Sequence, residues 1–245
     1  MDTRKNHLVN ANYRNHAHYI TEGWSQKPKE IFKKLASLIQ NQSGHENDRV
    51  LDVGCATGEL IYYLKSRFGG MDLTGVDIFP ELIEEAQQMV PFAQFQMASV
   101  MDLPQDFADS YDIVLAMGVL GIFDIEEAPR FFENLSRCTH KGGKIYVSSH
   151  FNDHPADVMI RHRKRMNGKL GDWERGWNIY SKETIGEILQ GQCKTHQFHE
   201  FHLPIPLAPK PDPVRSWTIR TEHNPYQLVN GLKLMIDLSI LEIVV

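Results

Sequence analysis

The chain has 245 residues, which is enough for one large α/β domain with additional segments and short for two enzyme domains. Its hydrophobic content of 42% and charged content of 23% are those of an ordinary globular protein. A net charge of -5 argues against a dedicated nucleic-acid binder, because such proteins usually carry a basic excess.

The first part of the chain predicts a helical cap. Residues 1–27 are polar and rich in His, Asn and Tyr, and the following segment, 28–40, carries apolar residues at helical spacing. Pro28 suits the first turn of that helix. We therefore expect residues 1–45 to form a helical cap or lid.

From residue 49 onwards, strand-like and helix-like stretches alternate. The strand-like stretches are 49–54, 71–77, 92–98, 111–118 and 143–151. The helix-like stretches are 58–68, 80–89 and 126–138. This alternation is typical of βαβ units, so the sequence predicts a doubly wound α/β fold with helices on both faces of a mostly parallel sheet.

Beyond residue 150 the pattern becomes less regular. Residues 154–180 predict an inserted helical segment, and 181–190 predict a helix with Ser181 as N-cap. The last residues, 227–245, fit either a final strand or an apolar segment packed on the core. We expect a single domain with four parts, namely the cap (1–45), a core (46–150), an acceptor-side helical insertion (151–192) and C-terminal strands (193–245).

The loop after the first predicted strand, DVGCATG, indicates a ligand site. Ligands of doubly wound sheets bind at the carboxyl ends of the strands, and Gly54 and Gly58 allow the backbone to approach a ligand closely. Asp77 ends the second predicted strand, where a carboxylate can accept hydrogen bonds from the two hydroxyls of a ribose. These features fit both NAD and S-adenosylmethionine.

The charge of the loop favours S-adenosylmethionine over NAD. Asp52 and Glu59 flank the glycines, and residues 50–64 contain no Lys or Arg. Two anions would each disfavour a diphosphate by roughly a kcal/mol at partial burial. S-adenosylmethionine instead carries a sulfonium and an ammonium, which acidic side chains attract.

The ordered motifs resemble the class I S-adenosylmethionine-dependent methyltransferases. VLDVGCATG (50–58) is similar to the first motif of that family, with Ala56 in place of the usual middle glycine, and GVDIFPELIEEA (75–86) is similar to the second. FQMASVMDLP followed by DSYDIVLAMGVLGIF, within 95–123, resembles the third and fourth motifs. The resemblance covers roughly residues 49–150 and implies a seven-stranded Rossmann-like sheet with S-adenosyl-L-methionine as cofactor.

The resemblance also implies which residues hold the cofactor. The loop residues frame its methionyl end, Asp77 binds the ribose and Ile78 packs on the adenine. Ser99 stands where many members of the family have an Asp, so we expect its hydroxyl and the backbone amide of Val100 to face the adenine. The complete set of expected cofactor-binding residues is Asp52, Gly54, Cys55, Ala56, Gly58, Asp77, Ile78, Ser99, Val100, Met117 and Gly118.

The expected reaction is methyl transfer to a small molecule, with O-methylation favoured over N-methylation. His150, at the end of the fifth predicted strand, is the candidate general base, because an imidazole with a pKa near 6.5 suits proton removal. A basic run, RHRKR (161–165), suggests an anionic acceptor or, as an alternative, RNA. A non-catalytic S-adenosylmethionine-binding protein is the third reading that the sequence leaves open.

The remaining features predict a cytoplasmic protein without a metal site. The three cysteines are scattered and odd in number, as expected for reduced thiols, and no signal peptide or membrane-spanning run is recognisable. His196, His199 and His202 alternate faces on a strand, so we expect no metal cluster there. The acceptor and the oligomeric state do not follow from the sequence.

Overall fold

The structure is a computed structural model that describes residues 19–20, 28–40, 47–163, 165–166, 168–200, 217–220, 222, 227–229 and 234–237. The chain divides into two compact units. The first comprises residues 1–149 and 160–177, and the second comprises residues 150–159 and 178–245. Each unit is described by itself below.

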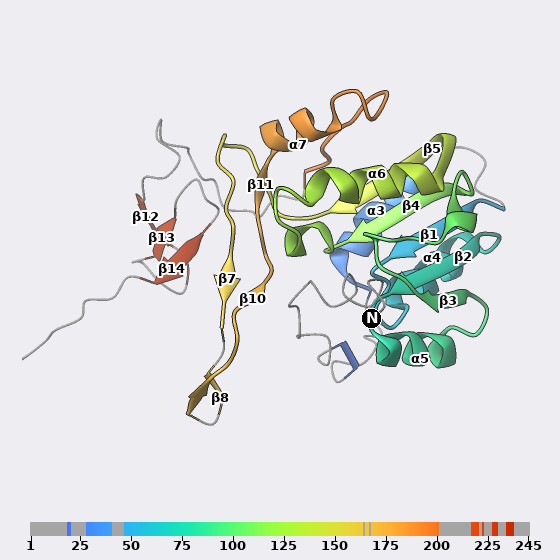
Figure 1. The fold of residues 1–245 in the computed structure, drawn as a ribbon, viewed down its shortest axis with the longest axis horizontal. Helices are drawn as coiled ribbons and strands as arrows, with labels where there is room; N and C mark the ends of the chain where they lie inside the picture. Colours follow the sequence, from blue (N-terminus) through green and yellow to red (C-terminus); the bar gives the residue numbers. More distant parts are fainter. Residues whose placement is uncertain are drawn as a thin grey trace, which may run out of the picture. The chain divides into compact units, whose positions relative to one another are not determined.

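A parallel five-stranded sheet forms the centre of the first unit, with the strand order β3-β2-β1-β4-β5 (Figure 1). The strands are β1 (Arg49–Val53), β2 (Asp72–Asp77), β3 (Gln94–Met97), β4 (Tyr111–Met117) and β5 (Thr139–Ser148). The strand order reverses between β1 and β4, which is the switch point where ligands of such sheets bind. The predicted α/β class and parallel sheet are confirmed, whereas the described residues place five strands in this sheet instead of seven.

Four helices accompany the sheet, and each lies where apolar residues recur at helical spacing. They are α3 (Glu30–Gln40), α4 (Glu59–Phe68), α5 (Pro80–Met89) and α6 (Ala128–Cys138). Two short 3-10 helices, η1 (Gln105–Phe107) and η2 (Leu120–Ile122), lie in the loops before and after β4.

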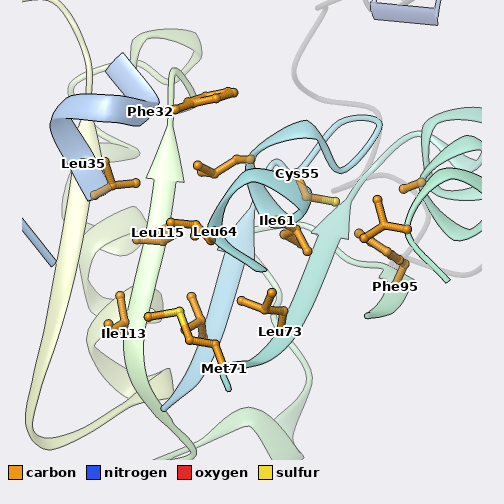
Figure 2. Close-up of a cluster of buried hydrophobic side chains, with 14 of the residues drawn as sticks. Phe32, Leu35, Cys55, Ile61, Leu64, Met71, Leu73, Phe95, Ile113 and Leu115 are labelled. Atoms are coloured by element: carbon orange, nitrogen blue, oxygen red, sulfur yellow. The ribbon is translucent and has the colours of Figure 1, made fainter. Parts of the chain in front are cut away.

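One hydrophobic cluster lies between α3, α4 and the strands (Figure 2). Leu35 and Leu64 from these helices pack with Leu73 of β2 and Leu115 of β4, and all four side chains are buried. Because side chains alternate along a strand, Asp52 of β1 lies on the same face as Val50, which belongs to this cluster. The burial of the Asp52 side chain therefore follows from the register of β1.

A structural polar pair lies at the amino ends of the strands. Asp112 accepts a hydrogen bond from the backbone amide of Arg49 at 2.7 Å, and its other carboxylate oxygen lies 2.5 Å from Nε2 of His140. This pair connects the starts of β1, β4 and β5. It lies at the amino ends of the strands, away from the edge where a ligand is expected.

Residues 161–175 form paired strands, so the prediction of a helix here is wrong. β7 (Arg161–His162) pairs antiparallel with β10 (Glu174–Arg175), and β8 (Arg165–Met166) pairs with β9 (Lys169–Leu170). The strands are only two residues long and lack a clear alternation of apolar and polar residues. Their sequence therefore contains no period from which strands could be recognised.

Ion pairs fix this hairpin to the loop after β4. Arg161 Nη2 lies 2.5 Å from Asp124 Oδ1, and Arg175 Nη1 lies 2.8 Å from Glu127 Oε2. Arg175 Nη2 also lies 3.5 Å from Asp124 Oδ2. These contacts lie within the first unit, and the pair of Arg161 occupies one of the charges that were expected to attract an anionic acceptor.

The second unit contains short strands and one helix. β6 (Phe151–Asn152) pairs with β11 (Tyr180–Ser181), and α7 (Lys182–Leu189) follows directly. The predicted N-cap is confirmed, because the Ser181 hydroxyl accepts a hydrogen bond from the amide of Thr184 at 3.0 Å. A separate antiparallel sheet consists of β12 (Trp217–Ile219), β13 (Gln227–Val229) and β14 (Met235–Asp237).

The helices of the described residues are all too short or too polar to cross a membrane.

Candidate functional site

The loops that follow β1, β2, β3 and β4 meet at the carboxyl edge of the sheet. Parallel strands end at the same edge, and the register pairs Val53 of β1 with Val76 of β2. The expected cofactor residues from Asp52 to Gly118 all belong to these strand ends or loops. The structure therefore brings them to one edge of one sheet, at the switch point.

The loop after β1 folds over the end of β2. The amides of Gly54 and Cys55 both donate hydrogen bonds to the carbonyl oxygen of Val76, at 2.8 and 3.0 Å. Gly54 has a φ of 77°, and a Cβ added there would lie 2.5 Å from Cγ2 of Val119, in the loop after β4. Glycine is therefore required at position 54, because both its conformation and the close approach of Val119 exclude a side chain.

Ala56 occupies the position where the family usually has glycine, and its φ is 46°. This is the left-handed region, which is costly for a residue with a Cβ atom. The amide of Ala56 donates a hydrogen bond to Asp77 Oδ2 at 3.0 Å, which helps to hold the loop in this conformation. The alanine is accommodated, but with backbone strain that its sequence position alone does not reveal.

Asp77 is anchored where a ribose-binding acid is expected. Its side chain is buried, and its two oxygens accept the amides of Ala56 (3.0 Å) and Phe79 (3.2 Å). Carboxylate oxygens are the acceptors that the hydroxyls of a ribose require. The two backbone bonds orient the carboxylate before any ligand binds.

Asp52 is the most strongly perturbed acid of the site. Burial, with a smaller contribution from the charge of Asp77, raises the pKa of Asp52 from 3.8 to about 7. Both effects disfavour the ionised form of the carboxyl group. A cation bound beside Asp52 would lower its pKa again, whereas a diphosphate would raise it further.

Glu59 is not a second free anion, contrary to the simple charge argument from the sequence. Its Oε2 lies 2.9 Å from Nζ of Lys29, which precedes α3. Lys29 lies outside the motif region, so the sequence argument missed it. Pairing of this kind has no local sequence signal, because the two residues are far apart along the chain and adjacent only in the fold.

The loop after β3 is built by Ser99. Its hydroxyl accepts a hydrogen bond from the amide of Met101 at 3.2 Å, and its carbonyl accepts one from the amide of Asp102 at 2.9 Å. The carbonyl of Val100 accepts a hydrogen bond from Nδ2 of Asn134 in α6 at 2.9 Å. Ser99 and Val100 are both buried, so their part in adenine binding remains a prediction that rests on the loop being held at this edge.

Met117 and Gly118 end β4 on the same edge, and Ile78 follows Asp77 directly. Gly118 has a φ of 78°, and none of the described residues comes within 4 Å of the position that its Cβ would occupy. The amide of Gly118 is bound to the carbonyl of Ser148 at 2.9 Å, so the backbone there is fixed. Gly118 is exposed, so its backbone is accessible to a ligand from the solvent.

The candidate base, His150, is exposed and belongs to the second unit, whereas these loops belong to the first. Tyr13, His16 and His18, which belong to the expected cap, lie outside the described residues. Tyr19 is described, with its ring centroid 5.9 Å from Nζ of Lys29.

A match to a known family decides what kind of domain this is. Residues 50–143, from β1 into β5, match the model of the family described as "Methyltransferase domain". Residues 50–143 are a methyltransferase domain. The methyltransferase domain contains every expected cofactor residue, and the cofactor that the family implies is S-adenosyl-L-methionine.

Relatives of known function are also methyltransferases. The chain is 22% identical over 189 residues to phosphoethanolamine N-methyltransferase 1 of Zea mays. The matched region covers 74% of this chain and 34% of that protein. It is 29% identical over 86 residues to malonyl-(acyl-carrier protein) O-methyltransferase of Anoxybacillus flavithermus, which covers 35% of this chain and 33% of that protein. The chain thus spans about a third of the length of these two relatives.

Solved structures share the fold. The sugar N-methyltransferase KedS8 from a Streptoalloteichus species superposes with a TM-score of 0.53 and 14% identity, covering 71% of this chain and 83% of that chain. At this level of identity the likeness shows the fold alone.

The residues at the carboxyl edge fit S-adenosylmethionine. Asp77 offers an anchored carboxylate at the end of β2, and Asp52 is a buried acid whose ionised form a ligand cation would stabilise. One oxygen of Glu59, Oε1, is buried without a hydrogen-bond partner. Together these groups offer acceptors to a ligand that carries hydroxyls and positive charges.

Proposed function

We propose that the protein is an S-adenosylmethionine-dependent methyltransferase that acts on a small molecule, with O-methylation favoured over N-methylation. The observation that carries the proposal is the anchored Asp77 carboxylate next to the buried Asp52, at the switch point of the sheet. When bound, S-adenosylmethionine supplies a methyl group on a sulfonium, which an acceptor displaces in line. The chain has to bind the donor, align the acceptor and exclude water.

Each loop is proposed to bind a different part of the methyl donor. Asp77 binds the ribose, Ile78 packs on the adenine, and Ser99 with Val100 lies beside its polar edge. The loop residues Asp52, Gly54, Cys55, Ala56 and Gly58, with Met117 and Gly118 opposite, hold the methionyl end. Two hydrogen bonds support this division, from the Ala56 amide to Asp77 and from the Gly54 amide to the carbonyl of Val76, because they fix the loop before the ligand arrives.

A small acceptor is supported by the relative from Zea mays, whose name gives phosphoethanolamine as its acceptor. The relatives include both N- and O-methyltransferases, so the preference for oxygen rests on the sequence argument for a base.

RNA as acceptor is a weaker alternative. In the basic run, Arg161 pairs with Asp124, and the guanidinium of Arg163 lies 4.8 Å from the ring centroid of Trp173. These contacts use two of the cations that would otherwise bind phosphates. The same contacts reduce the support for an anionic small acceptor.

The proposed location is the cytoplasm, which suits the free thiols of Cys55, Cys138 and Cys193.

We propose His150 as the general base for an oxygen acceptor. Replacing His150 by Gln should lower turnover of an identified hydroxyl acceptor by about 10²–10⁴-fold, because that is the usual contribution of general base catalysis. Affinity for S-adenosylhomocysteine should not change. The matched control is His154→Gln, four residues further on. Unchanged turnover in the His150 variant would exclude it as the base.

Thermal unfolding with added ligands tests the proposed donor. S-adenosylmethionine and S-adenosylhomocysteine should raise the melting temperature, and NAD should not, because a ligand that binds only the folded state stabilises it. At a hundred times its dissociation constant, a ligand contributes about 2.7 kcal/mol. A rise with NAD alone would contradict the proposal.

A further inference from the structure

We propose that Lys29 and Glu59 together bind the amino-acid end of the methyl donor, with Lys29 binding its carboxylate and Glu59 its ammonium. This inference rests on the proposed function, because it concerns the same ligand. It assigns a role to Lys29, which lies outside every motif of the methyltransferase domain.

The two charges come from segments that the fold brings together. Lys29 lies directly before α3, and Glu59 is the first residue of α4. Their charged atoms are 2.9 Å apart, and the side chain of Glu59 is mostly buried, with 18% of its surface exposed. Lys29 Nζ also lies 5.5 Å from the ring centroid of Phe32 in α3, so its position is supported from a second side.

Glu59 is only half satisfied by Lys29. Its Oε2 makes the ion pair, whereas its Oε1 is buried and has no hydrogen-bond partner in the described part of the chain. A buried carboxylate oxygen without a donor is destabilising, because it has lost its contact with water without gaining a hydrogen bond. An ammonium group provides three donors and would remove this cost.

The amino end of α4 gives a partial explanation for Glu59. The N-cap of α4 is Gly58, which has no side chain to bind the first amides of the helix. The amino end of a helix attracts negative charge, and this explains an acid at position 59 on structural grounds alone. That explanation does not account for the unused oxygen or for the lysine.

A zwitterion matches the pair in both charges. The amino-acid end of S-adenosylmethionine carries a carboxylate and an ammonium on one carbon atom. Binding would exchange the Lys29–Glu59 ion pair for two pairs with the ligand, so that no charge of the protein loses its partner. The glycine loop that lies directly before Glu59 was independently expected to frame this end of the ligand.

Three ligands separate the two proposed contacts. S-adenosylhomocysteine has both charged groups, decarboxylated S-adenosylmethionine lacks the carboxylate, and methylthioadenosine lacks the whole amino-acid end. Each is titrated calorimetrically into the full-length chain and into the variants Lys29→Met and Glu59→Gln. The matched control is Lys33→Met, four residues further on in α3, which removes a lysine whose partner is Glu30 at 2.5 Å.

Lys29→Met should lower the affinity for S-adenosylhomocysteine by about tenfold, which is the effect of one charged hydrogen bond. It should leave the affinity for decarboxylated S-adenosylmethionine unchanged. Glu59→Gln should weaken both of these ligands by about tenfold and leave methylthioadenosine unchanged. Lys33→Met should alter none of the three affinities. Melting temperatures without ligand show whether each variant is folded.

Two results would overturn the inference. One is an unchanged affinity of S-adenosylhomocysteine in both variants. The other is an equal loss for all three ligands, which would mean that the pair only supports the loop. Failure of the proposed function looks different, because the unaltered chain would then bind none of the three ligands.

Discussion

Asp52→Asn is expected to stabilise the ligand-free protein above neutral pH and to flatten the dependence of its stability on pH. The folded protein holds the Asp52 proton up to about pH 7, whereas the unfolded chain releases it near pH 3.8. Between these values the folded state binds more protons, so the free energy of unfolding falls as the pH rises. The stabilising effect of the proton is complete below about pH 4 and is lost as the pH passes 7.

The difference between the two pKa values corresponds to about 4 kcal/mol, which makes this one of the largest effects in the molecule. Chemical unfolding at pH 5, 6, 7 and 8 measures it, with the Asn variant compared at each pH. Asp72→Asn is the control, because Asp72 is exposed at the start of β2. If the two proteins had the same pH slope, Asp52 would not be the group that titrates.

Gly54→Ala is expected to destabilise the protein by about 2–5 kcal/mol. The positive φ costs a residue with a Cβ about 1–2 kcal/mol, and overpacking adds about 1–3 kcal/mol. The overpacking arises because the new Cβ would lie 2.5 Å from Cγ2 of Val119. Chemical unfolding of the variant gives the total cost.

Two further variants separate the two causes. Gly69→Ala also has a positive φ, but no described residue lies within 4 Å of its Cβ position, so it should show only the backbone cost. Val119→Ala combined with Gly54→Ala should be more stable than the sum of the single effects predicts, because the clash is removed. Strict additivity would mean that Val119 and the glycine loop do not meet.

The sequence predicts the core of the fold because the signals there are local. β1, β2 and β4 are apolar runs that end at the acid or glycine positions of the motifs, and α6 carries Phe131, Phe132 and Leu135 on one buried face. These periods depend on neighbouring residues only. The expected cofactor loops follow from the same strands, because parallel strands end at one edge.

Features that depend on contacts between distant residues could not be predicted. The hairpin at 161–175 is held by Arg161 and Arg175 on Asp124, and its two-residue strands carry no pattern of their own. The sequence shows Asp52 as one acid among several, whereas its perturbed pKa depends on burial by the sheet register. Lys29 is recognisable as a partner of Glu59 only after α3 and α4 are packed together.

The central claim is that the carboxyl edge of the sheet binds S-adenosylmethionine through Asp77. Calorimetric titration of S-adenosylhomocysteine into the full-length chain and into Asp77→Ala tests this claim most directly. We predict saturable binding at one site in the unaltered chain and affinity weaker by at least about tenfold in the variant, because the two ribose hydroxyls lose their charged acceptor. Equal affinity in the two proteins, with both of them folded, would contradict the account.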